Sequence, residues 1–364
     1  MKSYRATYMR GGTSRALIFN ESDLPADKKS WDEIFLRALG SPDPYGRQLN
    51  GMGGGISSLS KVAVVRASGN PAADVDYTFA QVSVTESKVD YKGNCGNISS
   101  AIGPFAVLQG LCKVTGGEAR VRIFNTNTQK IIHSIFPVKD SLPEFSGDLE
   151  IPGVAGTGAP IRLEFQEPGG ASTGSLLPTG KICESLQVVG VGAIEVSMVD
   201  AANACVMVRA RDLGLAGTEA PAELEHSVEL LKKLDLIRRH ASVTMGISKN
   251  LEDAANYIAI PYLGIISPAT GPDRDFEMRV IASGQPHKAL PLTVSLCAAV
   301  TAKLPGSVIH EAVQGRALSV VRIGMPTGVL QLSADVENEG GNWIARSGSF
   351  YRTARLLFVG EVFV

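Results

Sequence analysis

Residues 94–111, NCGNISSAIGPFAVLQGL, decide the fold of this chain. From Gly96 onward nearly every position is small or apolar, which predicts a helix without a polar face. A helix of this kind lies inside a domain, because other elements must cover it on all sides. Residues 287–303, HKALPLTVSLCAAVTAK, have the same character. The sequence therefore predicts two buried helices, over about 96–111 and 289–303.

Strand-like runs stand before and after these helices. KVAVVRA (61–67), DYTFAQVSV (76–84) and ARVRIFN (119–125) are alternating or β-branched and end at turn residues, which is typical of strands. The last segment, RTARLLFVGEVFV (352–364), also predicts a strand.

Two further helices are predicted, and the second of them is expected on the surface. Residues 30–39 begin with Ser30 and Glu33 spaced as a capping box and end at Gly40. Residues 221–240 begin with a proline and carry leucines on one face.

The two halves of the chain align weakly in a common order, which indicates an internal repeat. Four pairs of segments match: SRALIFNESDL (14–24) with ACVMVRARDL (204–213), KVAVV (61–65) with NYIAI (256–260), FAQVSV (79–84) with FEMRVIA (276–282), and ARVRIF (119–124) with LSVVRIG (318–324). We expect an α+β fold of two similar domains, each a curved, mostly antiparallel sheet or barrel around a central apolar helix. The first domain is predicted over 1–185 and the second over 186–349, with residues 350–364 returning to the first. The active site is expected in the cleft between them.

Composition narrows the class of protein. Lys plus Arg total 35 and Asp plus Glu total 36, so the net charge of −1 argues against a nucleic-acid-binding surface. The first ten residues contain no apolar core of a signal peptide, and no window has 18 uninterrupted apolar residues. We expect a cytoplasmic protein that binds no membrane. A homo-oligomer is compatible with this composition.

Cysteine and histidine spacing predicts no metal site. The five cysteines are widely spaced without a CxxC pair, and the five histidines form no HExxH motif.

Three polar clusters in the first half could carry chemistry. In MRGGTS (9–14), Arg10, Thr13 and Ser14 could bind a carboxylate, although the segment could equally be a glycine-rich hairpin with a surface arginine. GMGGGISSLSK (51–61) lacks the ending of a phosphate-binding loop and precedes a strand, which argues against nucleotide binding.

Lys61 and Cys95 are the two candidate catalytic residues. If Lys61 points inward, burial would lower its pKa and leave a neutral amine that can act as a base; otherwise it is a solvated lysine at a strand end. Cys95 precedes a helix, where the dipole favours a thiolate and the N–H groups of Gly96 and Asn97 can bind a carboxylate. The alternative is a capping turn that happens to contain a cysteine.

A fourth cluster lies in the second half, before the second buried helix. Arg279, His287 and Lys288 would add cationic groups there, unless they are ordinary loop charges.

Taken in order along the whole chain, these motifs resemble those of the PrpF family, within the diaminopimelate epimerase-like fold. The resemblance rests on MRGGTS, GMGGGISSLSK, DVDYTFAQVSV, NCGN, LLPTG (176–180) and RTARLLF (352–358). It implies a cofactor-independent isomerase that moves a proton along an allylic system of a small unsaturated di- or tricarboxylate. Examples in the family are 4-oxalomesaconate, 3-methylitaconate and 2-methylaconitate. It places catalytic roles on Lys61 and Cys95 and substrate contacts on Ser14 and the glycine-rich loop, of which we select Gly54, Gly55, Ser57 and Ser60.

Two other functions stay open at this point. One is a non-catalytic polycarboxylate-binding protein or an accessory protein of an aconitase-like enzyme. The other is an amino-acid racemase or epimerase. The resemblance argues against the second, because epimerases of this fold carry another catalytic cysteine at the start of the second buried helix, where this chain has HKALPL (287–292).

Overall fold

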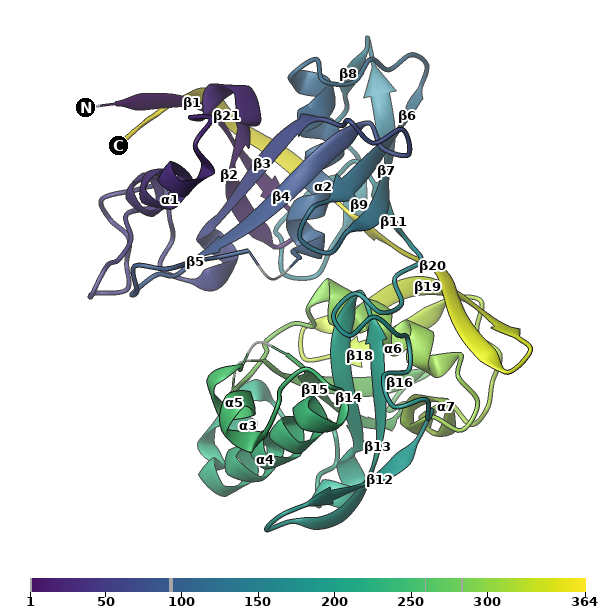
Figure 1. The fold of residues 1–364 in the computed structure, drawn as a ribbon. Coiled ribbons are helices and arrows are strands. Elements are labelled where there is room, and N and C mark those ends of the chain that lie inside the picture. Colours follow the sequence, from purple (N-terminus) through teal and green to yellow (C-terminus); the bar gives the residue numbers. More distant parts are fainter. Residues whose placement is uncertain (1, 92–93, 259, 283) are drawn as a thin grey trace. The chain divides into compact units, whose positions relative to one another are not determined.

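The structure, a computed structural model, describes residues 2–91, 94–258, 260–282 and 284–364. The chain forms two compact units, Met1–Glu164 with Tyr351–Val364, and Phe165–Phe350 (Figure 1). Strands β11 (Ile161–Gln166) and β20 (Asn342–Arg352) carry the chain from one unit to the other. Each unit is built mainly from strands.

Among its described residues, the first unit contains two α-helices and a set of strands that includes the C-terminal one. Its helices are α1 (Trp31–Leu39) and α2 (Gly96–Leu108). Its longer strands are β1 (Ser3–Gly11), β2 (Ser14–Asn20), β3 (Lys61–Ala67), β4 (Val75–Val82), β6 (Glu118–Asn125), β7 (Lys130–Lys139) and β21 (Ala354–Phe363). The short strands are β5 (Val89–Asp90), β8 (Leu142–Pro143), β9 (Leu149–Glu150) and β10 (Thr157–Gly158).

The second unit has more helices. They are α3 (Pro221–His226), α4 (Val228–Thr244), α5 (Leu251–Asn256), α6 (Leu292–Ala302) and α7 (Val308–Ala312). Its strands are β12 (Glu184–Val188), β13 (Gly192–Ala201), β14 (Asn203–Arg209), β15 (Tyr262–Pro268), β16 (Phe276–Ala282), β17 (Gln285–Pro286), β18 (Val321–Met325) and β19 (Gly328–Glu339).

Both units pair their strands in the same order. In the first, β1 and β2 are antiparallel, β2 and β3 parallel, β3 and β4 antiparallel, β4 and β6 parallel, and β6 and β7 antiparallel. Strands β13, β14, β15, β16, β18 and β19 repeat this sequence of pairings in the second. Parallel neighbours need a crossover, and helices supply it at each of these steps. The predicted α+β fold with two similar domains is confirmed.

The register of the strands corrects one predicted match of the repeat. Ala16 lies opposite Lys61 and Cys205 lies opposite Tyr262, so residues 61–65 correspond to 262–266. The predicted counterpart, 256–260, begins at the end of α5, and residue 259 lies outside the described residues. Both segments are rich in apolar residues, which is why composition alone selected the wrong one.

One apolar helix forms the centre of each unit, as predicted: α2 in the first and α6 in the second. Eleven of the thirteen residues of α2 and all eleven of α6 are buried. Strands β1, β2, β3, β6 and β7 all contact α2, so the sheet curves around it; β13, β14, β18 and β19 contact α6. The strands approach these helices closely at two glycines. A Cβ on Gly103 of α2 would lie 2.5 Å from the Ser134 Oγ of β7, and a Cβ on Gly348 of β20 would lie 2.0 Å from the Leu296 Cδ1 of α6.

Amphipathic helices pack on the outer side of the sheets. Trp31 and Phe35 of α1 join a buried cluster with Leu17 and Phe19 of β2. In the second unit, α4 packs in the same way through residues that include Leu234 and Ile237. The sheets are therefore covered on both faces, which explains their nearly continuous apolar sequences.

The predicted ends of these outer helices need correction. Ser30 precedes α1, but its side chain makes no capping bond and instead donates to the Asp27 carbonyl at 2.7 Å. Gly40 ends the helix at φ 75°, as predicted. The segment 221–240 is two helices, because Ser227 (φ −90°, ψ 81°) leaves the helical region and begins α4.

The first unit ends earlier than the predicted boundary at 185. The proline- and glycine-rich stretch before that residue folds onto the second unit. The Asp200 carboxylate accepts from the N–H groups of Ser172 and Thr173 at 2.7 and 2.6 Å. At the other end of the chain, β21 pairs with β1 from Ser3 to Gly11.

Candidate active site

Lys61 is the first residue of β3, and its side chain is buried among residues of β4. Only 8% of Lys61 is exposed. Its Nζ donates to the Gln81 Oε1 and lies 5.2 Å from the centroid of the Phe79 ring. Gln81 is held in turn by bonds from its Nε2 to the Ser60 carbonyl at 2.9 Å and the Ser57 carbonyl at 3.1 Å.

This setting changes the chemistry of the amine. Burial lowers the pKa of Lys61 below the ordinary 10.5, while the nearby Cys95 opposes the shift. A low dielectric disfavours the ammonium form, so a larger fraction of the side chain is a neutral base. Lys61 is therefore not a solvated lysine at a strand end.

Cys95 stands at the N-cap of α2, half-buried. Its Sγ lies 4.0 Å from the Oγ of Ser14, the first residue of β2. The Cys95 side chain makes no capping hydrogen bond to the first turn of α2. The N–H groups at such a helix start, together with the dipole, favour an anion.

Asn97 joins this helix start to two other elements. Its Nδ2 donates to the Thr13 Oγ1 at 3.1 Å, and its Oδ1 accepts from the Thr13 N–H and from the Arg352 Nε, both at 3.4 Å. The turn between β1 and β2 can approach Asn97 this closely because Gly12 (φ 51°) has no Cβ. A Cβ at this position would lie 2.1 Å from the Asn97 Oδ1.

Arg352 was missed by residue-by-residue reasoning, although its segment RTARLLF was noted. It is buried at the end of β20, and burial lowers its pKa to about 9. A buried guanidinium whose charged form is disfavoured gains from a nearby anion. The signal in the sequence was an arginine at the first position of the predicted strand 352–364. Its contact with Asn97, 255 residues away, could not be inferred locally.

Arg10 supports the hairpin. One of its guanidinium nitrogens donates to the carbonyls of Gly12 and Thr353, both at 2.9 Å. Burial lowers its pKa, and the charge of Arg355 adds to the effect. These bonds orient the loop that presents Thr13 and Ser14.

The glycine-rich loop is organised by a second residue that the sequence reasoning missed, the buried Gln48. Its Nε2 donates to the Ser60 Oγ at 2.7 Å, and its Oε1 accepts from the Gly55 N–H at 3.0 Å. Ser57 is exposed, and a Cβ on Gly54 would lie 2.6 Å from the Leu59 Cδ1. In this structure the backbone carbonyls of Ser57 and Ser60 hold Gln81, the hydrogen-bond partner of Lys61.

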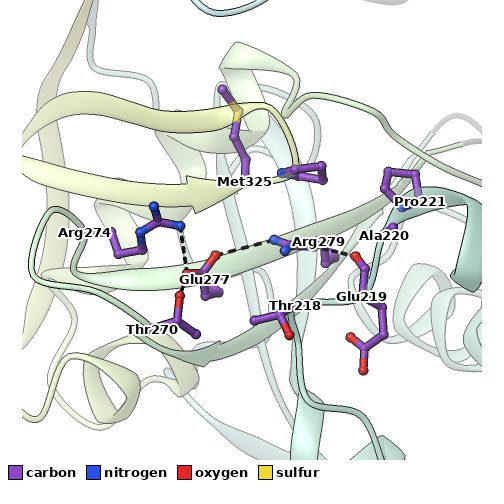
Figure 2. A pocket seen from close by; sticks show the side chains of 10 residues that line it. Thr218, Glu219, Ala220, Pro221, Thr270, Arg274, Glu277, Arg279 and Met325 are labelled. Atoms are coloured by element: carbon purple, nitrogen blue, oxygen red, sulfur yellow. Dashed lines mark hydrogen bonds and ion pairs between the residues drawn. The ribbon is translucent and has the colours of Figure 1, made fainter.

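The fourth predicted cluster belongs to the second unit, and its main member has other partners. Arg279 is buried on β16, where it donates to the Glu219 carbonyl at 2.9 Å and lies 3.6 Å from the Glu277 Oε2 (Figure 2). Glu277 also binds Arg274, at 3.1 Å, and Thr270. The five residues line a cavity of about 330 Å³.

The other members of that cluster are exposed. His287 accepts the Ala289 N–H at 3.2 Å, and Lys288 lies beside it on the surface. Their predicted meeting with Lys61 and Cys95 in a cleft stays a prediction.

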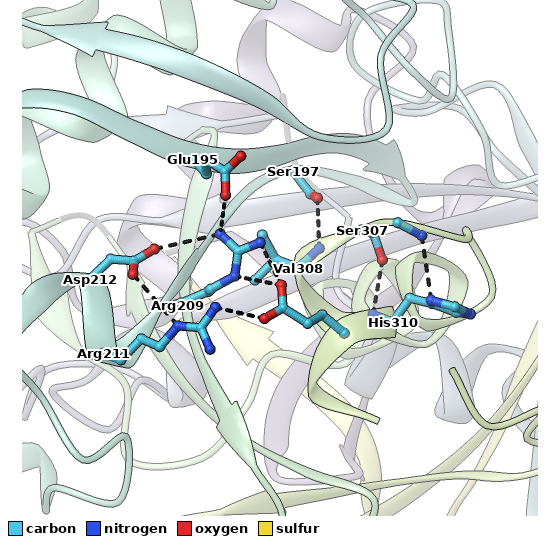
Figure 3. Close-up of polar contacts among 10 residues, drawn as sticks. Glu195, Ser197, Arg209, Arg211, Asp212, Ser307, Val308 and His310 are labelled. Carbon is cyan, nitrogen blue, oxygen red and sulfur yellow. Dashed lines mark hydrogen bonds and ion pairs between the residues drawn. The ribbon is translucent and has the colours of Figure 1, made fainter. Parts of the chain in front are cut away.

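A second polar cluster of this unit has a structural role. Arg209 of β14 binds Glu195 of β13 at 2.9 Å and Glu311 of α7 at 2.6 Å (Figure 3). The Ser197 Oγ accepts the Val308 N–H at the start of α7, at 3.0 Å. These bonds fasten α7 to the strands.

The start of α6 carries no thiol. Its N-cap is Pro291, at the place that Cys95 occupies before α2. Cys297 lies within α6, fully buried, with its Sγ 3.4 Å from the Val199 carbonyl. This geometry disfavours a racemase that needs two opposed thiols.

Comparison with known proteins identifies the group to which this fold and site belong. The model of the family described as PrpF protein matches residues 1–364. The chain belongs to the PrpF family. The predicted resemblance to this family is confirmed.

Curated relatives of this PrpF protein are isomerases. The 3-methylitaconate isomerase of Eubacterium barkeri is 36% identical, with 98% of this chain and 96% of the relative covered. The 2-methyl-aconitate isomerase of Shewanella oneidensis MR-1 is 34% identical over the same shares. The (4E)-oxalomesaconate Delta-isomerase of Novosphingobium sp. KA1 is 37% identical over 100% and 98%. The predicted class, an isomerase of this family, is confirmed.

Solved structures agree. A methylitaconate-delta-isomerase superposes with a TM-score of 0.87 at 36% identity, covering 100% of this chain and 96% of the other. A hydroxyproline epimerase from Agrobacterium vitis shares the fold, with a TM-score of 0.56 at 10% identity over 99% and 92%. The predicted epimerase-like fold is confirmed.

Two kinds of feature are absent from the described residues. No helix there combines the length and the apolar composition of a membrane span. Nor do three or more His, Cys, Asp or Glu side chains of these residues gather as metal ligands would.

Proposed function

We propose that this protein is a cofactor-independent isomerase that moves a proton along an allylic system of a small unsaturated di- or tricarboxylate. One observation carries the proposal: the buried amine of Lys61, held by Gln81, lies within electrostatic reach of Cys95 at the start of α2. Lys61 and Cys95 are the proposed catalytic pair.

The proposed reaction needs one base. The neutral amine of Lys61 takes a proton from the sp³ carbon next to the conjugated system, and the electron pair spreads over the allylic carbons and a carboxylate. The resulting ammonium returns the proton two carbons away, which moves the double bond. Cys95 either donates a proton or completes the anion site, and its substitution, described below, separates these roles.

Donors for the developing charge lie near Cys95 and Asn97. Asn97 joins the elements that carry these donors. They are the N–H groups of the first turn of α2, the hydroxyl groups of Thr13 and Ser14, and the guanidinium of Arg352. Positioned donors of this kind stabilise an enolate-like transition state. They also favour a substrate with more than one carboxylate.

The names of the relatives support the substrate class. Proteins 34 to 37% identical to this chain are named for three different acids, 2-methyl-aconitate, 3-methylitaconate and (4E)-oxalomesaconate. The identities differ too little to rank these acids. We therefore propose the class, unsaturated di- and tricarboxylates, with all three acids as candidates.

Proton NMR in deuterium oxide tests the proposal. The protein is mixed with each of the three acids and with aconitate, and the exchange of an allylic proton for deuterium is followed together with the double-bond shift. We expect both for at least one polycarboxylate. An unsaturated monocarboxylate of similar size is the control, and equal turnover of that acid would contradict the proposed charge selection.

A further inference from the structure

The turn between β6 and β7 contacts the loop that presents Cys95. Asn125, the last residue of β6, is fully buried. Its Oδ1 accepts the N–H groups of Asn127 and Thr128, both at 2.9 Å, which closes the turn. Its Nδ2 donates to the Asn94 Oδ1 at 2.9 Å. Asn94 directly precedes Cys95, so one buried amide joins the turn to the thiol loop.

The same turn contacts the strand beside Lys61. The Phe79 N–H donates to the Asn127 Oδ1 at 2.8 Å, and the Asn127 Nδ2 donates to the Phe79 carbonyl at 2.9 Å. Asn127 thus pairs with β4 as a neighbouring strand would. Phe79 is the residue whose ring lies over the Lys61 amine. The turn therefore contacts the surroundings of both proposed catalytic residues.

We propose that Asn125 is a positioning residue, which fixes the Cys95 loop relative to the Lys61 site through its bond to Asn94. The inference rests on the proposed function, since it gives this spacing a role in proton transfer. Reacting groups must be held to within about half an ångström by neighbours that are themselves fixed. A buried amide that makes three hydrogen bonds meets this requirement, because losing any of them leaves a polar group unpaired.

A double-mutant cycle tests the bond. The variants are Asn94→Ala, Asn125→Ala and the double variant. Thr126→Ala is the matched control, because it removes bonds of the same turn to Thr78 and Tyr77 and leaves Asn94 untouched. Three quantities are measured: kcat and KM for the polycarboxylate that is turned over, the rate at which iodoacetamide alkylates Cys95, followed by mass spectrometry of its peptide, and the midpoint of thermal unfolding.

We expect both single variants to lower kcat about tenfold or more while KM changes less than about threefold, because the loop moves but the substrate contacts remain. The double variant should be no slower than the slower single variant, since both remove the same bond. The Cys95 alkylation rate should change in all three and stay at the wild-type value in Thr126→Ala.

Other results would overturn the inference. If the two effects on kcat multiply, or if Asn94→Ala keeps full activity, Asn125 only closes its turn. If Asn125→Ala fails to fold, Asn94→Ala removes the same bond without touching the turn, and its kcat decides. If the wild-type protein turns over no polycarboxylate, the proposed function fails. The alkylation rates, which need no substrate, then still decide whether the bond fixes the Cys95 loop.

Discussion

At the scale of single residues, the burial of the Lys61 amine beside Gln81 and Phe79 makes it a stronger candidate base than an exposed lysine. The second unit has Tyr262 at the same register, so the amine is a departure from the repeat. We expect Lys61→Met to slow allylic proton exchange by about 100- to 10,000-fold, because the base is lost. The measurement is the NMR exchange rate. The exposed Lys88→Met is the control, and an activity within tenfold of wild type in Lys61→Met would rule out the assignment.

Burial of the same amine predicts a pH dependence of stability. The pKa of Lys61 is lowered in the folded protein, whereas the unfolded chain has the ordinary value of 10.5. Between these two values the unfolded state binds more protons, so the free energy of unfolding rises with pH. Lys61→Met lacks this contribution. Its stability advantage over wild type, measured in urea at a series of pH values, should shrink as pH rises; parallel curves would contradict a buried amine.

Cys95 can be separated from the other half-buried thiols. Cys95→Ser should lose most activity if the thiol takes part in proton transfer, because a hydroxyl group is a far weaker acid. Cys112→Ser is the matched control, since burial raises the pKa of Cys112 to about 11 and keeps it protonated. Both variants are assayed by NMR exchange. Full activity of Cys95→Ser would reduce Cys95 to a part of the anion site.

At the scale of elements, the repeat places the same ion pair in both units. Asp74 before β4 binds Arg122 of β6 at 2.7 Å, and Asp275 before β16 binds Arg322 of β18 at 3.1 Å. The Asp275 side chain is 0% exposed and that of Asp74 is 32% exposed. We expect Asp275→Ala to destabilise the protein more than Asp74→Ala, because the Asp275 carboxylate is fully buried and binds Arg316 as well as Arg322, whereas Asp74 is partly exposed. Urea unfolding measures both, and equal losses would contradict the comparison.

Local patterns predicted the elements better than their ends and contacts. The apolar run of α2 and the β-branched run of β3 were sufficient to predict these two elements. A segment that is apolar on every side must be buried, so its composition also predicts its place in the core. The capping box at Ser30 failed because Ser30 already has helical backbone angles (φ −81°, ψ −9°), whereas a capping residue is usually extended. The roles of Gln48, Gln81 and Asn125 depend on partners brought together by the sheet, and no local spacing reveals such contacts.

At the scale of the whole molecule, a net charge of −1 means that a polycarboxylate must be bound by local cations. The two units offer different ones. In the first, Arg352 lies beside the start of α2, where its Nε donates to the Asn97 Oδ1 and its Nη1 to the Tyr351 carbonyl. In the second, the Arg279 guanidinium forms an ion pair with Glu277 and donates to the Glu219 carbonyl. Glu277 therefore already balances the charge of Arg279.

This difference predicts that two buried arginines respond differently to the same substitution. Arg352→Met should raise KM about tenfold or more, because a charge-assisted bond to the substrate is lost. Arg279→Met should change KM less than about twofold and destabilise the protein by about 2 kcal/mol or more, because Glu277 loses a partner in a buried site. Steady-state kinetics with the active polycarboxylate and urea unfolding provide the two readouts. A tenfold rise of KM in Arg279→Met would show instead that the second unit also binds the substrate, and that the balance of charge around Glu277 changes when it does.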